Sequence, residues 1–286
     1  MRPLIEMPRT VAAQVHTVLS DIDDTITSHG YLTPDAYAAL AALREQGVRV
    51  ILVTGRPAGW CDHIARMWPI DGVIGENGAF YLWYDRQVRR LHTRHLLSAG
   101  EREANSKRLA AVREKILAEV PGCALATDQC YRLYDLAIDY CEDVPALPEG
   151  TVARIVALMQ DAGMTAMVSS IHVNGWFGTY NKLDMAKIML LERYKLDHQQ
   201  ARQSCVYVGD SPNDAPMFGF FPLSVGVANV AQYKDTLVSS PAYLCLAECG
   251  AGFAELSRFI LDARAPDDET PIAQAHMAHA VGQPAL

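Results

Sequence analysis

Apolar runs of strand length alternate with longer mixed segments over the first 75 residues. The run Val48 to Val53 is β-branched and aliphatic throughout, which is typical of a strand covered on both faces. Thr33-Pro34 is a helix-start signal, because Thr33 can cap a helix and Pro34 suits its first position. We therefore predict strands over 15–21, 48–53 and 72–75 and helices over 33–46 and 57–68. This order predicts a parallel sheet wrapped by helices, an α/β fold.

The pattern changes at Asn77-Gly78, a dipeptide typical of a hairpin turn. Beyond it, runs that resemble paired strands are mixed with two helical segments. We predict strands over 79–84, 87–92, 164–169 and 171–177, an exposed strand over 131–140, and helices over 98–120 and 151–161. Such a mixture is typical of an α+β unit, and we assign residues 84–177 to a separate unit inserted into the first domain.

The first pattern returns after the insert. We predict helices over 181–194 and 252–263 and strands over 205–208, 223–227 and 242–245. The core domain is therefore discontinuous, with residues 15–83 and 178–264. Residues 1–14 look like a loose leader, and we expect residues 265–286, rich in Pro, Ala, Asp and His, to form a disordered tail.

Composition narrows the possible partners. The chain of 286 residues is 50% apolar and 20% charged, as expected for a globular protein large enough for two domains. Its net charge of −8 argues against bulk nucleic-acid binding, which needs clustered Lys and Arg. We find no apolar stretch of membrane-spanning length and no apolar signal core at the N-terminus. The seven cysteines include no CxxC pair, so we expect reduced thiols in a cytoplasmic protein.

Two carboxylates follow the first predicted strand. Side chains alternate along a strand, so Asp21 and Asp23 start out on the same side. Neighbouring carboxylates raise each other's pKa unless a cation lies between them, so this pattern predicts a divalent metal or a shared proton. Hard oxygen ligands favour Mg²⁺. The alternative interpretation is a strand end followed by a polar turn.

Polar groups follow two further strands as well. Ligands of such a sheet lie outside the carboxyl ends of its strands, where Thr54 and the pair Asp210 and Asp214 are also expected. Lys182 begins the helix after the insert. Taken singly, these residues suit a helix cap, a turn or a surface charge.

Together these groups suit phosphoryl transfer. Asp21 would attack phosphorus as the nucleophile. Asp23 would protonate the leaving oxygen and later take a proton from water. Thr54 and Lys182 would hold the phosphoryl oxygens, and Mg²⁺ would bridge Asp21 and Asp210.

These segments resemble the four motifs of the haloacid dehalogenase superfamily phosphatases. The motifs are Asp21-Ile22-Asp23-Asp24-Thr25, Val53-Thr54-Gly55-Arg56, Asn181-Lys182 and Gly209-Asp210-Ser211-Pro212-Asn213-Asp214. The Asn77-Gly78-Ala79 turn and the α+β insert are similar to the Cof-type branch, subclass IIB, whose insert is a C2B cap. The resemblance covers roughly residues 15–263. It implies a Rossmann-like core with a cap, and that branch includes sugar-phosphate phosphatases and phosphomannomutase-like enzymes.

The resemblance also implies roles for single residues. Asp21 is the expected nucleophile, and Asp23 is the expected acid/base, which also gives its backbone carbonyl to Mg²⁺. Asp210 is an expected metal ligand, and Asn213 and Asp214 either complete the metal shell or orient Lys182. Two departures are Asp24 and Leu183, which stand where many relatives have Gly.

The cap should set the choice of substrate, because the catalytic residues recognise only phosphate. His172 and Asn174 alternate onto one face of a predicted strand, and Asn77 lies in the turn before the cap. We expect these three residues, with Gly55 and Arg56 of the second motif, to contact substrate. An exposed polar strand edge and a structural salt bridge at Arg56 are the alternatives. Further candidates in the cap are Tyr131, Arg132 and Tyr134.

The expected function is Mg²⁺-dependent hydrolysis of a small phosphorylated metabolite, with a sugar phosphate as one candidate. A phosphomutase on the same scaffold and a non-catalytic binding protein are the alternatives. We expect no nucleic-acid or membrane partner, and the sequence gives no indication of oligomeric state.

Overall fold

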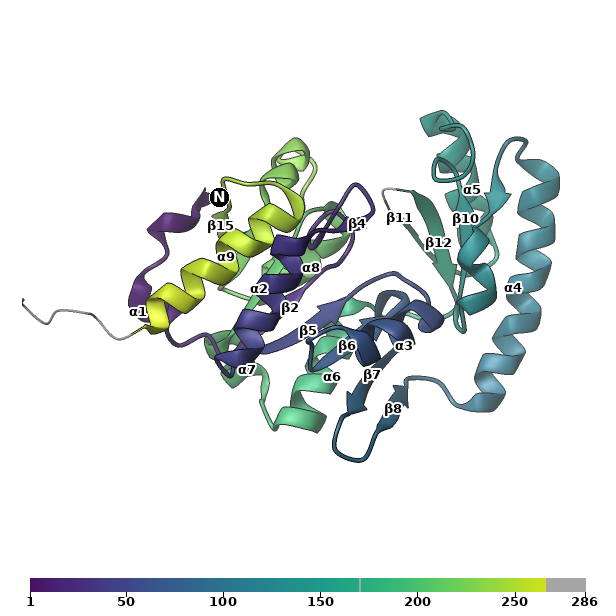
Figure 1. The fold of residues 1–286 in the computed structure, drawn as a ribbon. Helices are drawn as coiled ribbons and strands as arrows, with labels where there is room; N and C mark the ends of the chain where they lie inside the picture. The colour runs from purple at the N-terminus through teal and green to yellow at the C-terminus, as the bar shows by residue number, and fades with distance from the viewer. Residues whose placement is uncertain (170, 266–286) are drawn as a thin grey trace, which may run out of the picture.

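The computed structural model describes residues 1–169 and 171–265, which form a core and a cap placed side by side (Figure 1). The core contains a nine-stranded sheet. Its strands, in spatial order, are β1 (Arg2–Pro3), β15 (Tyr243–Leu244), β14 (Ser224–Gly226), β13 (Cys205–Gly209), β2 (Thr17–Ser20), β5 (Arg49–Val53), β6 (Gly72–Gly75), β7 (Phe80–Asp85) and β8 (Arg90–His95). The pairs from β1 to β6 are parallel, and β7 and β8 add an antiparallel ribbon at one edge.

Helices cover both faces of this sheet, as the α/β prediction requires. One face carries α1 (Arg9–Ala12), α2 (Pro34–Glu45), α3 (Ala58–Met67) and α9 (Cys249–Arg264), and the other carries α6 (Lys182–Tyr194), α7 (His198–Ser204) and α8 (Ala215–Phe220). Val18 and Leu19 of β2 belong to opposite apolar clusters, because successive side chains of a strand point to opposite faces. Both are fully buried, so the central strands are apolar on both sides.

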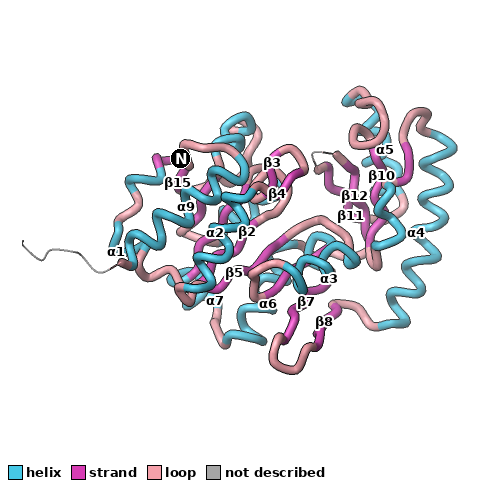
Figure 2. Tube along the Cα trace, in the orientation of Figure 1, coloured by secondary structure: helices cyan, strands magenta, loops and turns pink. Residues whose placement is uncertain are grey.

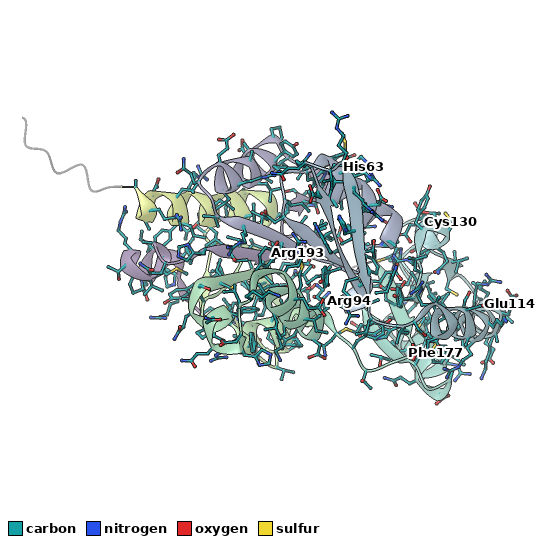
Figure 3. All side chains as sticks on the ribbon, turned by 90° about the horizontal axis from the view of Figure 1, so that it is seen from below. His63, Arg94, Glu114, Cys130, Phe177 and Arg193 are labelled. Carbon is teal, nitrogen blue, oxygen red and sulfur yellow. The ribbon has the colours of Figure 1, made fainter. Side chains whose placement is uncertain are left out.

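The cap is a smaller sheet backed by two helices. Its antiparallel strands are β11 (Thr165–Val168), β12 (His172–Trp176), β10 (Asp135–Asp139) and β9 (Ala124–Leu125), and its helices are α4 (Ala99–Glu119) and α5 (Glu149–Asp161). Ile116 of α4, Leu158 of α5 and Val173 of β12 share one apolar cluster. Figure 2 shows the two sheets as separate groups of strands, and Figure 3 shows Glu114 and Phe177 on the cap side and Arg193 on the core. In the described part of the chain, no helix is both long and apolar enough to cross a bilayer.

Three local predictions are wrong. Residues 2–12 are not a loose leader, because β1 pairs with β15 and Leu4 is buried. The ribbon strand β8, predicted within the insert, pairs with β7 in the core sheet, so the core continues to His95. The segment 131–140 is not an exposed strand, because β10 is buried along its whole length.

Several short elements carry no clear sequence signal. A hairpin of β3 (Thr27–Ser28) and β4 (Tyr31–Leu32) follows the first motif. Helices α7 and α8 have 7 and 6 residues, too few for a helical period to stand out. The predicted tail at 265–286 lies outside the described residues, except for Ala265.

Gly78 packs against the start of α6. Its φ is +108°, and a Cβ there would lie 2.2 Å from the carbonyl oxygen of Asn181. Neither the backbone conformation nor the space therefore permits a side chain.

We expect Gly78→Ala to lower the free energy of unfolding by roughly 2–4 kcal/mol, because it adds backbone strain and a main-chain clash. Urea unfolding measures the change. Gly100→Ala is the control, since Gly100 lies in the exposed α4 and a Cβ added there would have no atom within 4 Å. The control should be neutral or stabilising by up to about 1 kcal/mol. Equal midpoints for the two variants would contradict the prediction.

Candidate active site

The polar residues that follow β2, β5 and β13 lie together at the carboxyl ends of these strands. The register pairs Ser20 with Leu52 on one side and with Val208 on the other, so the three strands end level. The backbone N–H of Asp21 donates to Val208 O at 3.0 Å, which continues the pairing past the end of β2. The first, second and fourth motifs therefore meet at the carboxyl ends of these strands, as predicted.

Lys182 brings the third motif to the same place. Asn181 caps α6 by accepting from the N–H of Asp184, and Lys182 is the first residue of that helix. The Lys182 Nζ atom donates to Asp21 Oδ1 at 2.6 Å, Asp214 Oδ1 at 2.9 Å and Asn213 Oδ1 at 3.2 Å. Burial opposes the ammonium charge, but Asp21 and Asp214 outweigh it and raise the pKa of Lys182.

Asp214 is occupied by donors on both oxygens. Besides Lys182, Tyr207 OH donates to its Oδ1, and the backbone N–H of Asp210 donates to its Oδ2 at 3.1 Å. A Cβ at Gly209 would lie 2.3 Å from that Oδ2, so only glycine leaves room for this carboxylate. The geometry favours Asp214 as the residue that orients Lys182, one of the two roles expected for it.

Asp210 is held by two uncharged donors. Thr25 Oγ1 donates to Asp210 Oδ1 at 3.2 Å, and Asn229 Nδ2 lies 3.3 Å from Oδ2. Asn229 was not among the residues predicted from the sequence. It follows β14 at the carboxyl ends of the strands, where ligands of such a sheet lie, so its position could have pointed to it.

The backbone conformation at Asp24 shows how the chain tolerates Asp where many relatives have Gly. Its φ is 55°, in the left-handed region where Gly is favoured, and its carbonyl accepts from Asn229 Nδ2 at 3.0 Å. Asp is one of the residues that tolerate this conformation better than most. The chain therefore keeps the turn without Gly and adds a half-buried carboxyl, whose pKa burial and Asp23 raise.

The donor set fits a divalent cation. One carboxylate oxygen each from Asp21, Asp210 and Asp214 lie within 4.8 Å of one another. Burial first, and then the neighbouring carboxylates, raise the pKa of Asp210 to about 9 and that of Asp21 to about 7, although Lys182 opposes both shifts. A cation between Asp21 and Asp210 would offset this repulsion, and their hard oxygens suit Mg²⁺.

Asp23 is paired with Arg56. The Arg56 Nε atom donates to both Asp23 oxygens at 3.1 Å, and Nη2 donates to Oδ1 at 2.9 Å. Arg56 also lies with its guanidinium carbon 4.4 Å from the ring centre of Trp60. The structure thus shows the salt bridge that was the alternative to substrate contact for Arg56.

A cavity of about 650 Å³ lies between the carboxyl ends of these strands and the cap. Most of the predicted site residues line it. They are Asp21, Asp23, Gly55, Arg56, Asn77, His172, Asn174, Asp210 and Asn213. Thr54, Lys182 and Asp214 do not line it and are buried.

Two polar residues on the cap wall of the cavity contact other residues of the cap. His172 Nε2 lies 2.8 Å from Glu142 Oε2, although not in hydrogen-bonding alignment, and burial lowers the pKa of His172 to about 4. Asn174 Nδ2 donates to Asp135 Oδ2 at 3.0 Å. Of the three further cap candidates, Arg132 lines the cavity, whereas Tyr131 and Tyr134 do not.

Glu76 ties the cap to the core. Its buried carboxylate accepts backbone N–H groups from Ala58 of the core and from Leu133, Tyr134 and Asp135 of the cap, at 2.6–3.3 Å. The next residue, Asn77, has a φ of 56°, and its side chain packs against Gly55. The sequence predicted substrate contact for this turn, but it gave no signal of the link to the cap.

This chain is similar in sequence to a known protein family. Residues 18–101 match the family model described as haloacid dehalogenase-like hydrolase. The match covers 84 of the 286 residues and contains the first and second motifs. No curated protein matched the chain in a sequence search.

Solved structures share the fold of this chain. A Thermoplasma acidophilum protein has a TM-score of 0.67 at 18% identity, over 86% of this chain and 98% of its own. The C-terminal domain of a C. albicans trehalose-6-phosphate phosphatase has a TM-score of 0.66 at 14% identity, over 92% and 98%. A Synechocystis sucrose-phosphatase, solved with sucrose and phosphate, has a TM-score of 0.60 at 16% identity, over 86% and 98%.

The raised pKa values predict how added magnesium would change the stability of this protein. Both carboxyl groups titrate near 3.8 in the unfolded chain, so the folded state holds protons that the unfolded state has lost, up to about pH 7 at Asp21 and up to about pH 9 at Asp210. Raising the pH through this window destabilises the metal-free protein. Because Mg²⁺ must displace those protons, it should raise the melting temperature by roughly 5 °C or more at about pH 8 and by less at about pH 5.

Thermal unfolding at the two pH values, with and without MgCl₂, measures this effect. Asp210→Asn should remove the shift. Asp62→Asn should keep it, since Asp62 is exposed on α3 and pairs with Arg66. A shift that is equal at both pH values, or that survives Asp210→Asn, would refute the metal assignment.

Proposed function

We propose that this protein is a Mg²⁺-dependent phosphatase of a small phosphorylated metabolite. The observation that carries the proposal is the position of Lys182, whose ammonium contacts Asp21 and Asp214 beside Asp210. Groups separated by up to 193 positions in the chain thus meet beside one cavity, which Asp21 and Asp210 line and behind which Lys182 supplies compensating positive charge.

Asp21 is the proposed nucleophile. One of its carboxylate oxygens attacks the phosphorus of the ester, the bond to the leaving oxygen breaks, and an aspartyl-phosphate forms on Asp21. The buried Lys182 stabilises the negative charge that the phosphoryl oxygens gain, because a fixed cation is effective where water is excluded. Thr54 holds the loop below, since its Oγ1 accepts the N–H of Arg56 at 3.0 Å.

Asp23 is the proposed proton donor and acceptor. It gives its proton to the leaving oxygen in the first step, and it takes a proton from the water that attacks phosphorus in the second. That attack breaks the bond to Asp21, which restores its carboxylate and releases inorganic phosphate.

Magnesium would be held by the carboxylates of Asp21 and Asp210 and by the backbone carbonyl of Asp23. The bound ion supplies positive charge to the phosphoryl oxygens and neutralises the crowded carboxylates. Asn213 Oδ1 already accepts from Lys182 and from Ser211 Oγ, which uses both of its lone pairs and supports the role of orienting Lys182.

A sugar phosphate is the proposed substrate class. Two proteins of the same fold are named for phosphorylated disaccharides, trehalose-6-phosphate and sucrose phosphate. The cavity of about 650 Å³ exceeds the space that a phosphoryl group alone requires and admits an organic leaving group. We propose the cytoplasm as the compartment, since Cys61, Cys205 and Cys245 are buried thiols.

We expect Asp21→Asn to reduce phosphate release at least roughly 10³-fold across a panel of phosphate esters with Mg²⁺, because it removes the nucleophile. A colorimetric phosphate assay measures this, with magnesium omitted as a control. Asp62→Asn, the same change on the exposed α3, should retain wild-type rates. Full activity of Asp21→Asn would refute the assignment, isomerised product without phosphate would indicate a phosphomutase, and no turnover of any ester would indicate a binding protein.

A further inference from the structure

The Arg56 guanidinium is the nearest partner of the proposed acid/base. Three hydrogen bonds join its Nε and Nη2 to the Asp23 carboxylate, at 2.9–3.1 Å. The side chain of Arg56 is 10% exposed, so little water competes with these bonds. A planar guanidinium that binds both carboxylate oxygens fixes the orientation of the carboxylate as well as its position.

The backbone around Arg56 is fixed by residues of both domains. Arg56 O accepts the N–H of Glu76 at 3.1 Å, and Glu76 binds the cap backbone through its carboxylate. The peptide carbonyl before it, Gly55 O, accepts from Arg132 Nη1 of the cap at 3.1 Å. A movement of the cap would therefore move the loop that carries Arg56.

The remaining nitrogen of Arg56 faces two carboxylates of the cap. Its Nη1 atom lies 3.9 Å from Asp128 Oδ2 and 3.8 Å from Glu142 Oε1. The Asp128 side chain is 9% exposed and that of Glu142 is 33% exposed, so solvent screens the first pair less than the second. Arg56 thus lies between one core carboxylate and two cap carboxylates.

The cap residue expected to meet the leaving group contacts the same network. His172 lines the cavity, and its Nε2 lies 2.8 Å from the second oxygen of Glu142. Contacts therefore run from His172 through Glu142 and Arg56 to Asp23. A group that binds against His172 is linked to Asp23 through these two side chains.

We propose that Arg56 is a positioning residue for Asp23 and that the cap, through Asp128 and Glu142, sets where the Arg56 guanidinium lies. This inference rests on the proposed phosphatase function and assigns Arg56 no direct contact with the phosphoryl group. Catalysis by Asp23 then depends on the cap, because the leaving oxygen must meet a carboxyl group held at the correct angle.

The dependence on the leaving group tests this role. A poor leaving group needs a proton in the transition state, whereas p-nitrophenolate leaves readily without one. We expect Arg56→Lys to lower kcat for glycerol 2-phosphate by roughly 10²-fold, and the double variant Asp128→Asn/Glu142→Gln by roughly 10-fold. For p-nitrophenyl phosphate, the burst of p-nitrophenolate from the first step should stay within about twofold of the wild-type rate, because that leaving group does not need the oriented proton. Steady-state turnover falls for both esters, since Asp23 also takes the proton from water in the second step.

A double-mutant cycle asks whether Arg56 acts through Asp23. In an Asp23→Asn background, adding Asp128→Asn/Glu142→Gln should cause no further loss on glycerol 2-phosphate, because the group being oriented is gone. Glu149→Gln is the matched control, since it removes a carboxylate from the exposed start of α5 and should leave both substrates unaffected. Glu142→Gln alone changes a partly exposed side chain, so it reports the effect in a folded protein if the double variant unfolds.

The outcomes separate the inference from the proposed function. A loss of the p-nitrophenolate burst rate as large as the loss of kcat on glycerol 2-phosphate, or a rise in KM with unchanged kcat, would assign Arg56 to phosphate binding and overturn the positioning role. A further loss in the Asp23→Asn background would overturn it as well. A wild-type protein that hydrolyses neither ester would remove the proposed phosphatase function, and the inference would fall with it.

Discussion

The structure depends on one buried ammonium group placed among carboxylates. Three carboxylates gather at the end of a sheet where little water reaches them, and Lys182 is the cation that contacts two of them. Burial alone would keep such groups protonated, so the fold must supply positive charge at this point. The missing side chain at Gly209 and the cap of α6 at Asn181 both serve that requirement.

Chain topology explains how the lysine reaches the carboxylates. The chain leaves the core after β8, builds the cap and returns to begin α6 at Lys182. Leu96, where the chain enters the cap, donates its N–H to Ala79 O at 3.0 Å, and the neighbouring Gly78 packs against Asn181, which follows the cap. The entrance and exit of the insert therefore lie together beside the reacting groups, and the cap is anchored next to the chemistry that it covers.

The main strands and the polar residues at their ends could be predicted because they rest on local signals. Buried runs such as Val50–Val53 stand out in the sequence, and the edge at which parallel strands end follows from topology. The contacts of Glu76 with the cap backbone and the partner of Arg56 could not be predicted, since each joins residues far apart in the chain through hydrogen bonds that leave no periodic pattern. The loose leader was wrong because two residues suffice to add an edge strand, which is too short for any pattern to show.

The way in which Glu76 binds the cap affects how the cap sequence can change during evolution. Its carboxylate binds main-chain N–H groups of residues 133–135, which every amino acid except proline provides. Side chains on the cap can therefore be exchanged without loosening its attachment to the core. Point substitutions in the cap can thus give such a scaffold a new substrate selectivity while the catalytic residues of the core stay unchanged.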